Sequence, residues 1–243
     1  MLKALGNGAS GLNAQQLKVD ILANNLANIN TTGFKKSQPG FAELVVQEVL
    51  NSGIPVTAGR TSDSLGSGVR IADVTRIYKQ GDLIETGCDL DLAIHGEGFF
   101  KVLLPDGEER YTRDGSFTLD PDGNIVTPAG YKLEGIQLTP GFSRVNISTD
   151  GTVRVTDYDE ITAVVGQIQL YRFASMQKLQ ARGENLYSFT GTADEIVAGS
   201  PGSDGFGEIR QGYLERANVD PVEEMTKLIE AQRAYGFSAR IVR

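Results

Sequence analysis

The sequence predicts an α+β fold, with a discontinuous α-helical coiled-coil unit formed by both termini and a central all-β domain, an antiparallel sandwich or barrel. Three observations support this prediction. Apolar residues repeat with heptad spacing near the amino terminus, a capped amphipathic segment ends the chain, and short apolar runs alternate with turn sequences between them. The expected division is 1–45 and 208–243 for the helical unit, 46–68 for a linker and 69–207 for the β domain.

The first segment, residues 1–45, carries an apolar stripe that is typical of an amphipathic helix. Gly33, which follows two threonines, is expected to end this helix. Two interpretations of the stripe stay open: it covers the core of its own domain, or it pairs with a helix from a distant part of the chain. The stripe consists of Leu5, Leu12, Val19, Leu22 and Leu26.

The last segment, residues 208–243, predicts a second helix that begins at Asp220 and Pro221. Aspartate is a favourable N-cap, and proline fits the first helical position because its missing N–H would have no partner there. Two neighbouring rows of side chains follow: Val222, Met225, Ile229 and Gln232 in one, and Leu228, Ala231, Tyr235 and Val242 in the other. If the β domain closes on itself, the two end helices can lie side by side.

The middle of the chain has the composition of a β domain bounded by linkers. Turn sequences such as Pro105-Asp106-Gly107 and Pro121-Asp122-Gly123-Asn124 separate strand-like apolar runs at short intervals. These turns and the linkers account for much of the high glycine content, 29 of 243 residues. The glycine-rich and serine-rich stretch 199–207 predicts a second linker on the far side of the β domain.

Charge and residue counts exclude several function classes. The formal net charge is −8, and the acidic excess lies in residues 46–207, which argues against a nucleic-acid partner bound through a basic face. Cys88 and His95 are the only residues of their types, so they cannot complete the usual Cys and His ligand set of a zinc site. The sequence has no G-x-S-x-G element, so the lone histidine gives a serine triad little support. We therefore expect no enzyme activity, catalytic residue, metal or cofactor. No apolar run is long enough for membrane insertion or for a cleavable signal peptide.

The motif Asn24-Asn25-Leu26-Ala27-Asn28 near the amino terminus and the motif Gln232-Arg233-Ala234-Tyr235 near the carboxyl terminus resemble those of the bacterial flagellar basal-body rod and hook family of axial proteins. Ordered β-domain motifs, including Gly96-Glu97-Gly98-Phe99-Phe100 and Gln211-Gly212-Tyr213-Leu214-Glu215, extend the resemblance over nearly the whole chain. The terminal signatures comprise Asn24, Asn25, Leu26, Ala27, Asn28, Thr31, Gly33, Phe34 and Lys35 at one end, and Gln232, Arg233, Ala234 and Tyr235 at the other.

The resemblance implies a structural subunit that polymerises helically into a hollow drive shaft and transmits motor torque to the hook. The size and the segments around Gly68 and Gln80 look most like the distal rod subtype. Another rod or hook-type subunit is one alternative, and a secreted β-sandwich adhesin with helical ends is a second. The implied partners are copies of itself, other rod and hook subunits and ring proteins that surround the rod. The implied location is the flagellar basal body in the cell envelope.

The carboxyl end departs from the family pattern. Gly236 and Phe237 follow the terminal signature where glutamate is usual, and family members typically continue the last helix beyond the position of Arg243. The contacts of the terminal helix with other copies therefore cannot be carried over from the family pattern at these positions.

Overall fold

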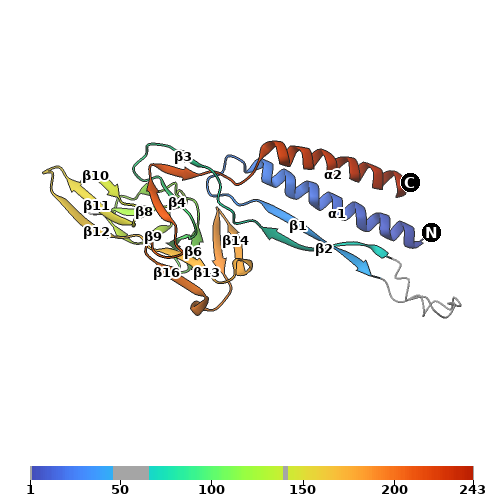
Figure 1. Cartoon of the computed structure of the whole chain (residues 1–243), viewed down its shortest axis with the longest axis horizontal. Helices are drawn as coiled ribbons and strands as arrows, with labels where there is room; N and C mark the ends of the chain where they lie inside the picture. Colours follow the sequence, from blue (N-terminus) through green and yellow to red (C-terminus); the bar gives the residue numbers. More distant parts are fainter. Residues whose placement is uncertain (1, 46–65, 139–141, 243) are drawn as a thin grey trace. The chain divides into compact units, whose positions relative to one another are not determined.

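The computed structural model describes residues 2–45, 66–138 and 142–242 (Figure 1). The chain divides into two compact units, and each unit is assembled from separate stretches of sequence. Unit 1 consists of Met1–Ala27, Lys36–Ile77 and Val219–Arg243, and unit 2 consists of Asn28–Lys35 and Tyr78–Asn218. The predicted linker residues 46–65 lie outside the described residues.

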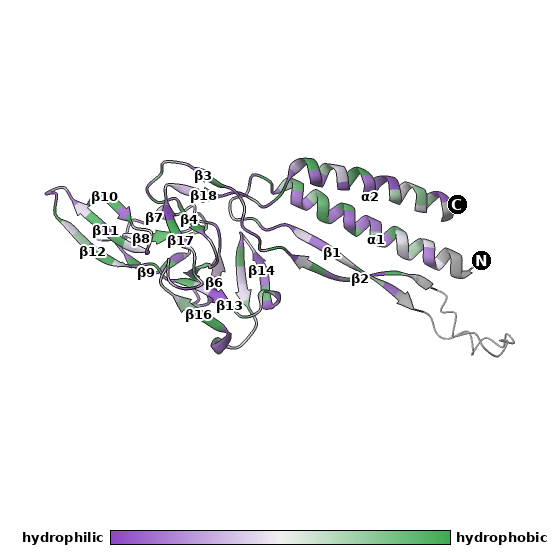
Figure 2. Cartoon of the chain, in the orientation of Figure 1, coloured by the Kyte–Doolittle hydropathy of each residue, from purple (hydrophilic) through white to green (hydrophobic). Residues whose placement is uncertain are grey.

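Unit 1 contains two helices and a two-stranded antiparallel ribbon. The helices are α1 (Leu2–Ala27) and α2 (Pro221–Val242), and the ribbon pairs β1 (Ser37–Val45) with β2 (Gly66–Arg76). Helix α1 contacts α2 as well as both strands of the ribbon. Both helices carry bands of hydrophobic and hydrophilic residues along their length, as an amphipathic sequence requires (Figure 2).

The ribbon corrects the predicted boundaries. Residues 66–68 begin strand β2 instead of ending a linker, and residues 69–76 belong to unit 1 instead of the β domain. Helix α1 ends at Ala27, before Gly33, where the sequence predicts its end, and the rest of the predicted segment 1–45 contains strand β1. The physical reason is that β1 and β2 satisfy each other's backbone groups along their register, from Ser37↔Arg76 to Val45↔Gly66, and pack against α1.

Unit 2 is an antiparallel β structure. Its largest sheet has seven strands in the order β14-β15-β6-β5-β9-β8-β7, and a three-stranded sheet has the order β10-β11-β12. The pairs β13-β16, β17-β4 and β18-β3 complete it. The seven-stranded sheet ends on two unjoined edge strands, so the described strands form no closed barrel.

The strands of unit 2 are short, as the spacing of the turn sequences predicts. Those before the three-stranded sheet are β3 (Leu83–Glu85), β4 (Leu92–His95), β5 (Phe100–Leu103), β6 (Glu109–Thr112), β7 (Thr118–Leu119), β8 (Asn124–Val126) and β9 (Lys132–Gln137). The three-stranded sheet consists of β10 (Phe142–Ile147), β11 (Thr152–Asp157) and β12 (Thr162–Gln167). The last are β13 (Leu170–Phe173), β14 (Leu179–Gly183), β15 (Leu186–Phe189), β16 (Ile196–Gly199), β17 (Glu208–Gln211) and β18 (Tyr213–Glu215), with 3₁₀ turns η2 (Met176–Lys178) and η3 (Ala193–Glu195).

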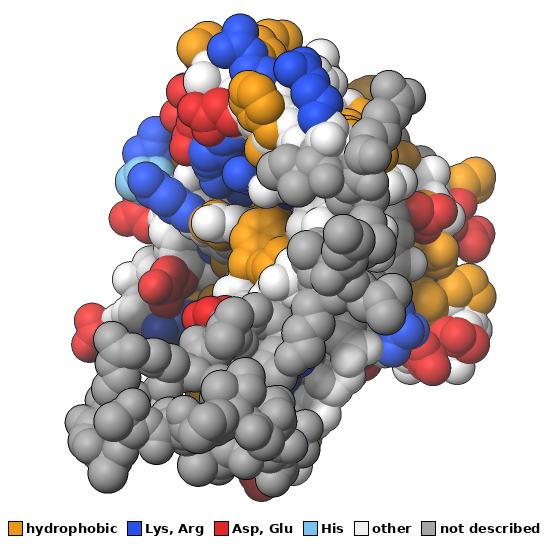
Figure 3. Space-filling view, turned by 90° about the vertical axis from the view of Figure 1, so that its right-hand side faces the viewer, with side chains coloured by type: hydrophobic (Ala, Val, Ile, Leu, Met, Phe, Trp, Pro, Cys, Tyr) orange, Lys and Arg blue, Asp and Glu red, His pale blue; other side chains and the backbone are white. Residues whose placement is uncertain are grey.

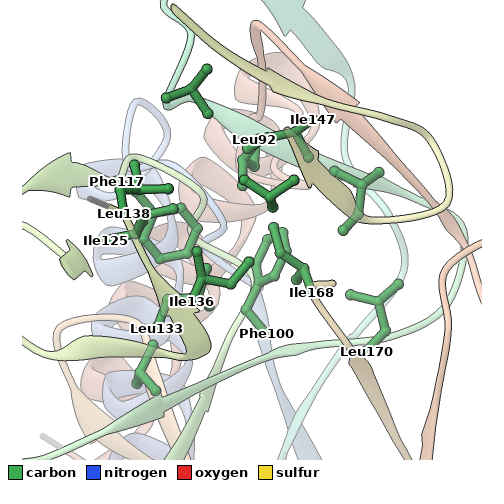
Figure 4. Close-up of a cluster of buried hydrophobic side chains, with 14 of the residues drawn as sticks. Leu92, Phe100, Phe117, Ile125, Leu133, Ile136, Leu138, Ile147, Ile168 and Leu170 are labelled. Carbon is green, nitrogen blue, oxygen red and sulfur yellow. The ribbon is translucent and has the colours of Figure 1, made fainter. Parts of the chain in front are cut away.

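Two clusters of buried side chains form the core of unit 2. The larger cluster gathers aliphatic residues and Phe100 and Phe117 from several of the strands, as the close-up in Figure 4 shows. The second is aromatic and includes Phe99, Tyr111 and Tyr187. Phe206 packs against the first cluster, and Gly202 donates its N–H to the Gly207 carbonyl. The predicted linker 199–207 is therefore largely a packed loop of unit 2, and β17 and β18 continue the same unit beyond it.

The structure thus confirms the α+β class, with helices at both ends and antiparallel strands between them. Among the described residues, no helix combines the length and the apolar character needed to cross a lipid bilayer.

Candidate assembly surface

Helix α1 is partly covered within its own unit. Leu22 is buried, whereas Leu12, Val19 and Leu26 are half-buried. The structure describes no side chain at Leu5. Helix α1 contacts α2, which comes from the opposite end of the chain, as well as both strands of the ribbon. Both interpretations of the stripe therefore apply within the single chain: α1 covers its own unit, and it pairs with a distant helix.

Helix α2 is covered on one side only. Ala231 is 1% exposed and Leu228 is half-buried, so the predicted row that contains them faces the interior of unit 1. The neighbouring row points outward: Val222 is 72% exposed, Met225 51% and Ile229 52%. We call these three residues the outer row of α2. Burying one such side chain completely contributes roughly 1.5–3 kcal/mol. The single chain leaves about half of that contribution or more unused, since the three side chains are 51–72% exposed.

The carboxyl half of α2 adds exposed aromatic rings and cations. Tyr235 is 40% exposed, although its predicted row otherwise faces inward, and Phe237, which the sequence patterns did not single out, is 61% exposed. The guanidinium carbon of Arg240 lies 5.6 Å from the centre of the Phe237 ring. Figure 3, which views the molecule from the side of the two chain ends, shows basic and hydrophobic side chains mixed at the top. The Val242 side chain is not described.

Asn25 is a buried polar junction within unit 1. Its side-chain amide, 1% exposed, donates to the Ser37 carbonyl at 2.9 Å and to Glu224 Oε2 at 3.0 Å, and its Oδ1 accepts the Ser37 N–H at 2.9 Å. Glu224 is buried as well, and Lys36 Nζ lies 3.8 Å from its Oε1. A single signature residue therefore joins the end of α1, the start of β1 and the first turn of α2.

Lys35 is a buried cation within unit 2. Its Nζ lies 2.5 Å from Glu215 Oε1 and donates to the Lys79 carbonyl at 2.9 Å. Arg113 Nη1 lies 3.3 Å from the other Glu215 oxygen, and the Gly81 N–H donates to Oε1. The side chains of Lys35 and Glu215 are fully buried. Burial lowers the pKa of Lys35, and the neighbouring Glu215 carboxylate opposes that shift.

The segment before Lys35 is held against unit 2 by its backbone. The Gly33 N–H donates to the Glu215 carbonyl at 2.8 Å, and Gly33 has φ +67°. A Cβ at this position would lie 2.6 Å from the Asp114 nitrogen, so the site requires glycine for both space and backbone conformation. Thr32 Oγ1 donates to Asp114, and Phe34 is 7% exposed. These signature residues therefore serve the fold of unit 2.

The structure separates the signature residues into three groups. Asn25 lies in the polar junction of unit 1, and Gly33, Phe34 and Lys35 are buried in unit 2. The rest are exposed or half-buried: Asn24, Leu26, Ala27, Asn28, Thr31, Gln232, Arg233, Ala234 and Tyr235. The sequence patterns assigned no charge partner to Glu215, Glu224 and Arg113. Glu215 had a signal, since it ends one of the family-like motifs, but a motif does not say which charge its carboxylate meets.

Chemical sites are sparse in the part of the chain that the structure describes. No group of three or more His, Cys, Asp and Glu side chains there is arranged to hold a metal ion. Cys88 is an exposed free thiol, and His95 is exposed on β4. The uncovered apolar side of α2 is the described surface that adjoins the terminal family signature, and it is the candidate assembly surface.

Comparison with known proteins identifies the family. The family descriptions that match are "Flagella basal body rod protein" over residues 5–35, "Flagellar hook protein FlgE/F/G D1 domain" over 93–155 and "Flagellar basal body rod FlgEFG protein C-terminal" over 210–243. The flagellar basal-body rod protein FlgG of Borreliella burgdorferi is 42% identical, over 100% of this chain and 94% of its own. FlgG of Caulobacter vibrioides is 40% identical over 99% and 94%. FlgF of the same organism is 38% identical over 100% and 93%.

These matches confirm the family resemblance that the sequence motifs indicated. They span both terminal helices and the β unit in one order, and the FlgG proteins match over the whole length. The chain belongs to the family of flagellar basal-body rod and hook proteins and is similar to its FlgG members.

Proposed function

We propose that the chain is a structural subunit of the flagellar basal-body rod, of the distal type, that polymerises helically into a hollow shaft carrying torque from the motor to the hook. The observation that carries the proposal is the similarity to FlgG proteins over the whole chain, at 37–42% identity. The proposed location is the basal body in the cell envelope, reached by flagellar export without a cleavable signal peptide. The proposed subunit has no catalytic role and needs no cofactor.

The uncovered side of α2 supplies a means of polymerisation. An open helical polymer needs heterologous contacts, in which different surfaces of successive copies meet and never close into a ring. The outer row of α2 offers an apolar surface that other copies can bury. We propose that α1 and α2 of neighbouring copies pack in coiled-coil fashion, with Leu5, Leu12, Val19, Leu22 and Leu26 together with Val222, Met225, Leu228, Ile229 and Tyr235 as the assembly residues.

The distribution of charge supports this division of roles. Unit 2 contains 13 basic and 22 acidic residues, and unit 1 contains 10 and 9. Unit 1 therefore has almost no net charge, so copies of it can approach without net repulsion. The proposed partners are copies of the chain, other rod and hook subunits, and rod-surrounding ring proteins.

Electron microscopy of the purified chain tests the proposal. We expect rods or short tubes from the unchanged chain and none from Ile229→Asp, because a carboxylate in the outer row would be buried without a partner. Ile229→Asp should unfold at the same temperature as the unchanged monomer, since the side chain is 52% exposed. Leu26→Asp should also block assembly while unit 2 stays folded.

A matched control and two contrary outcomes complete the experiment. Glu230→Gln changes an exposed residue next to Ile229 and should leave assembly intact. Normal tubes from Ile229→Asp and Leu26→Asp would contradict the assembly residues. Absence of any polymer, together with turnover of a small substrate, would contradict the structural role itself.

A further inference from the structure

Strand β12 leaves part of its outer edge open in unit 2. It is hydrogen-bonded as a strand to β11 alone. Strand β9 also contacts β12, and the carbonyl of Gly135 lies close to Gly166. Among the described residues, no hydrogen bond reaches the outer edge between Thr162 and Val165. The strand carries no charge and no proline, the features that usually protect an edge from pairing.

The opposite edge of the same sheet, on β10, is protected from pairing with another strand. On β10, Gln211 accepts the Ile147 N–H at 2.9 Å and donates to the Val145 carbonyl at 2.9 Å. A side chain from β17 therefore occupies the backbone groups at which another strand would pair. Strand β12 has no such cover in the described chain, which makes its edge the accessible one.

Apolar side chains surround the open edge. Val164 on β12 is 64% exposed, and the turn that leads into the strand exposes Tyr158 by 75% and Ile161 by 67%. The turn is held by its own hydrogen bonds: the Asp157 N–H donates to the Ile161 carbonyl, and the Glu160 N–H donates to the Asp157 carbonyl, both at 3.0 Å. A surface fixed before binding loses little conformational entropy when a partner arrives.

The same turn is strongly acidic. Asp157, Asp159 and Glu160 lie within five residues, and none of them forms an ion pair among the described residues. The nearby cation Arg154, which is opposite Val164, already donates to Ser148 Oγ at 2.8 Å. The Asp157 carboxylate accepts only the Tyr158 N–H, at 2.7 Å, so its negative charge is not paired with a cation in the described chain. The acidic turn favours a basic partner, and the net negative charge of unit 2 disfavours a second copy of unit 2.

We propose that the edge of β12 and the 157–161 turn form a strand-addition site for an extended segment of another protein, in which apolar and basic residues alternate. The segment would pair with the backbone of Thr162–Val165, cover Val164 and Ile161, and place its cations against the carboxylates of the turn. Figure 1 shows the three strands β10, β11 and β12 to which the segment would be added. The proposal does not depend on polymerisation through α2.

A labelled synthetic peptide of alternating valine and lysine tests the site on the full chain, kept at a concentration where it is monomeric. We expect fluorescence anisotropy to show binding that weakens about tenfold when the peptide backbone is N-methylated, since charge and side chains are kept and donors are lost. Val164→Lys should weaken binding to a similar extent. Val197→Lys, a matched change at a 54% exposed valine on β16, should not.

A separate variant tests whether the carboxylates of the 157–161 turn contribute to binding of the peptide. Asp159→Asn combined with Glu160→Gln should weaken binding and reduce its dependence on salt. Equal affinity for the methylated and unmethylated peptides, or no binding of either, would overturn the proposal. So would sedimentation showing that the chain associates with itself through this edge, with Val164→Lys abolishing the association. Electron microscopy of Val164→Lys separates this proposal from the proposed function. If this variant still forms tubes, polymerisation through α2 does not depend on the edge of β12, whichever result the peptide gives.

Discussion

At the scale of single residues, two polar side chains of the amino-terminal signature are buried and stabilise the fold, which their residue types do not predict. A lysine is rarely buried, yet Lys35 lies inside unit 2 with Glu215 and Arg113 around it. Asn25 is buried in unit 1, where Ser37 and Glu224 satisfy its amide. Each residue joins parts of the chain that are far apart in sequence, so each stabilises the fold of its own unit.

Lys35→Met should destabilise unit 2 by about 3 kcal/mol, because it leaves the buried Glu215 carboxylate with one cation fewer. Urea unfolding monitored on the β signal measures the loss. The control is Lys178→Met, which removes a surface pair with Glu195 whose side chains are 44% and 28% exposed and should cost less than about 1 kcal/mol. Equal losses for the two variants would contradict a special role for the buried cation.

The tyrosines around Lys101 give unit 2 a distinct alkaline titration. Burial, with help from Glu109 and Glu134 respectively, raises the pKa of Tyr111 and of Tyr171 from 10.0 to about 12. A phenol whose folded pKa is raised stabilises the fold fully below pH 10 and loses that contribution as the pH rises toward 12.

Ultraviolet absorbance of tyrosinate should therefore show late titration in the folded chain. Tyr111→Phe and Tyr171→Phe should each remove part of the absorbance that develops near pH 12. A single transition near pH 10 for all eight tyrosines would contradict the burial argument.

At the scale of elements, periodicity located both helices and divided α2 into two rows, of which Leu228 and Ala231 face inward while Tyr235 of the same row is exposed. It could not decide which row would be covered, because both rows are apolar and the answer depends on where α1 lies. It also missed the ribbon of β1 and β2, whose strands border the residues 46–65 that look like a linker by composition. Glycine and serine content describes the flexibility of an isolated chain, whereas a partner strand supplies backbone hydrogen bonds that composition does not reveal.

The junction of α1, β1 and α2 depends on a single amide. Asn25→Ala should lower the stability of unit 1 by about 1–3 kcal/mol, because the Ser37 backbone groups and the buried Glu224 lose their partner. Thermal melting followed by the helical circular dichroism signal measures the change. Asn13→Ala, at an exposed position of α1, should be neutral or slightly stabilising. A similar loss from both variants would show that the amide acts only through helix propensity.

At the scale of the whole molecule, the two units differ in how much apolar surface they bury. Among the described residues, the buried hydrophobic side chains of unit 1 are Ala14, Ile21, Leu22, Val219 and Ala231, whereas unit 2 has two large clusters. A thin core implies low local stability. We infer that the helices of unit 1 gain much of their stability when copies assemble.

Hydrogen exchange on the monomer tests this difference. Residues 2–27 and 221–242 should exchange fast, whereas residues 28–35 should exchange slowly with unit 2, because the Gly33 N–H and the Lys35 side chain bind there. The boundary is therefore expected near Asn28 instead of at the end of the amino-terminal signature. Slow exchange throughout α1 and α2, or fast exchange at 28–35, would contradict the assignment.

The α+β class, the two terminal helices, the acidic antiparallel middle and the family could be predicted from the sequence, because periodicity, turn chemistry, charge and motifs are properties of neighbouring residues. Four features could be read only from the folded chain: Lys35 pairs with Glu215, Asn25 bonds to Glu224, one row of α2 stays uncovered, and β2 belongs with the helices. Each of these depends on contacts between residues far apart in the chain. Burial and pairing arise when distant segments meet, and a linear pattern records what each segment offers without recording what it meets.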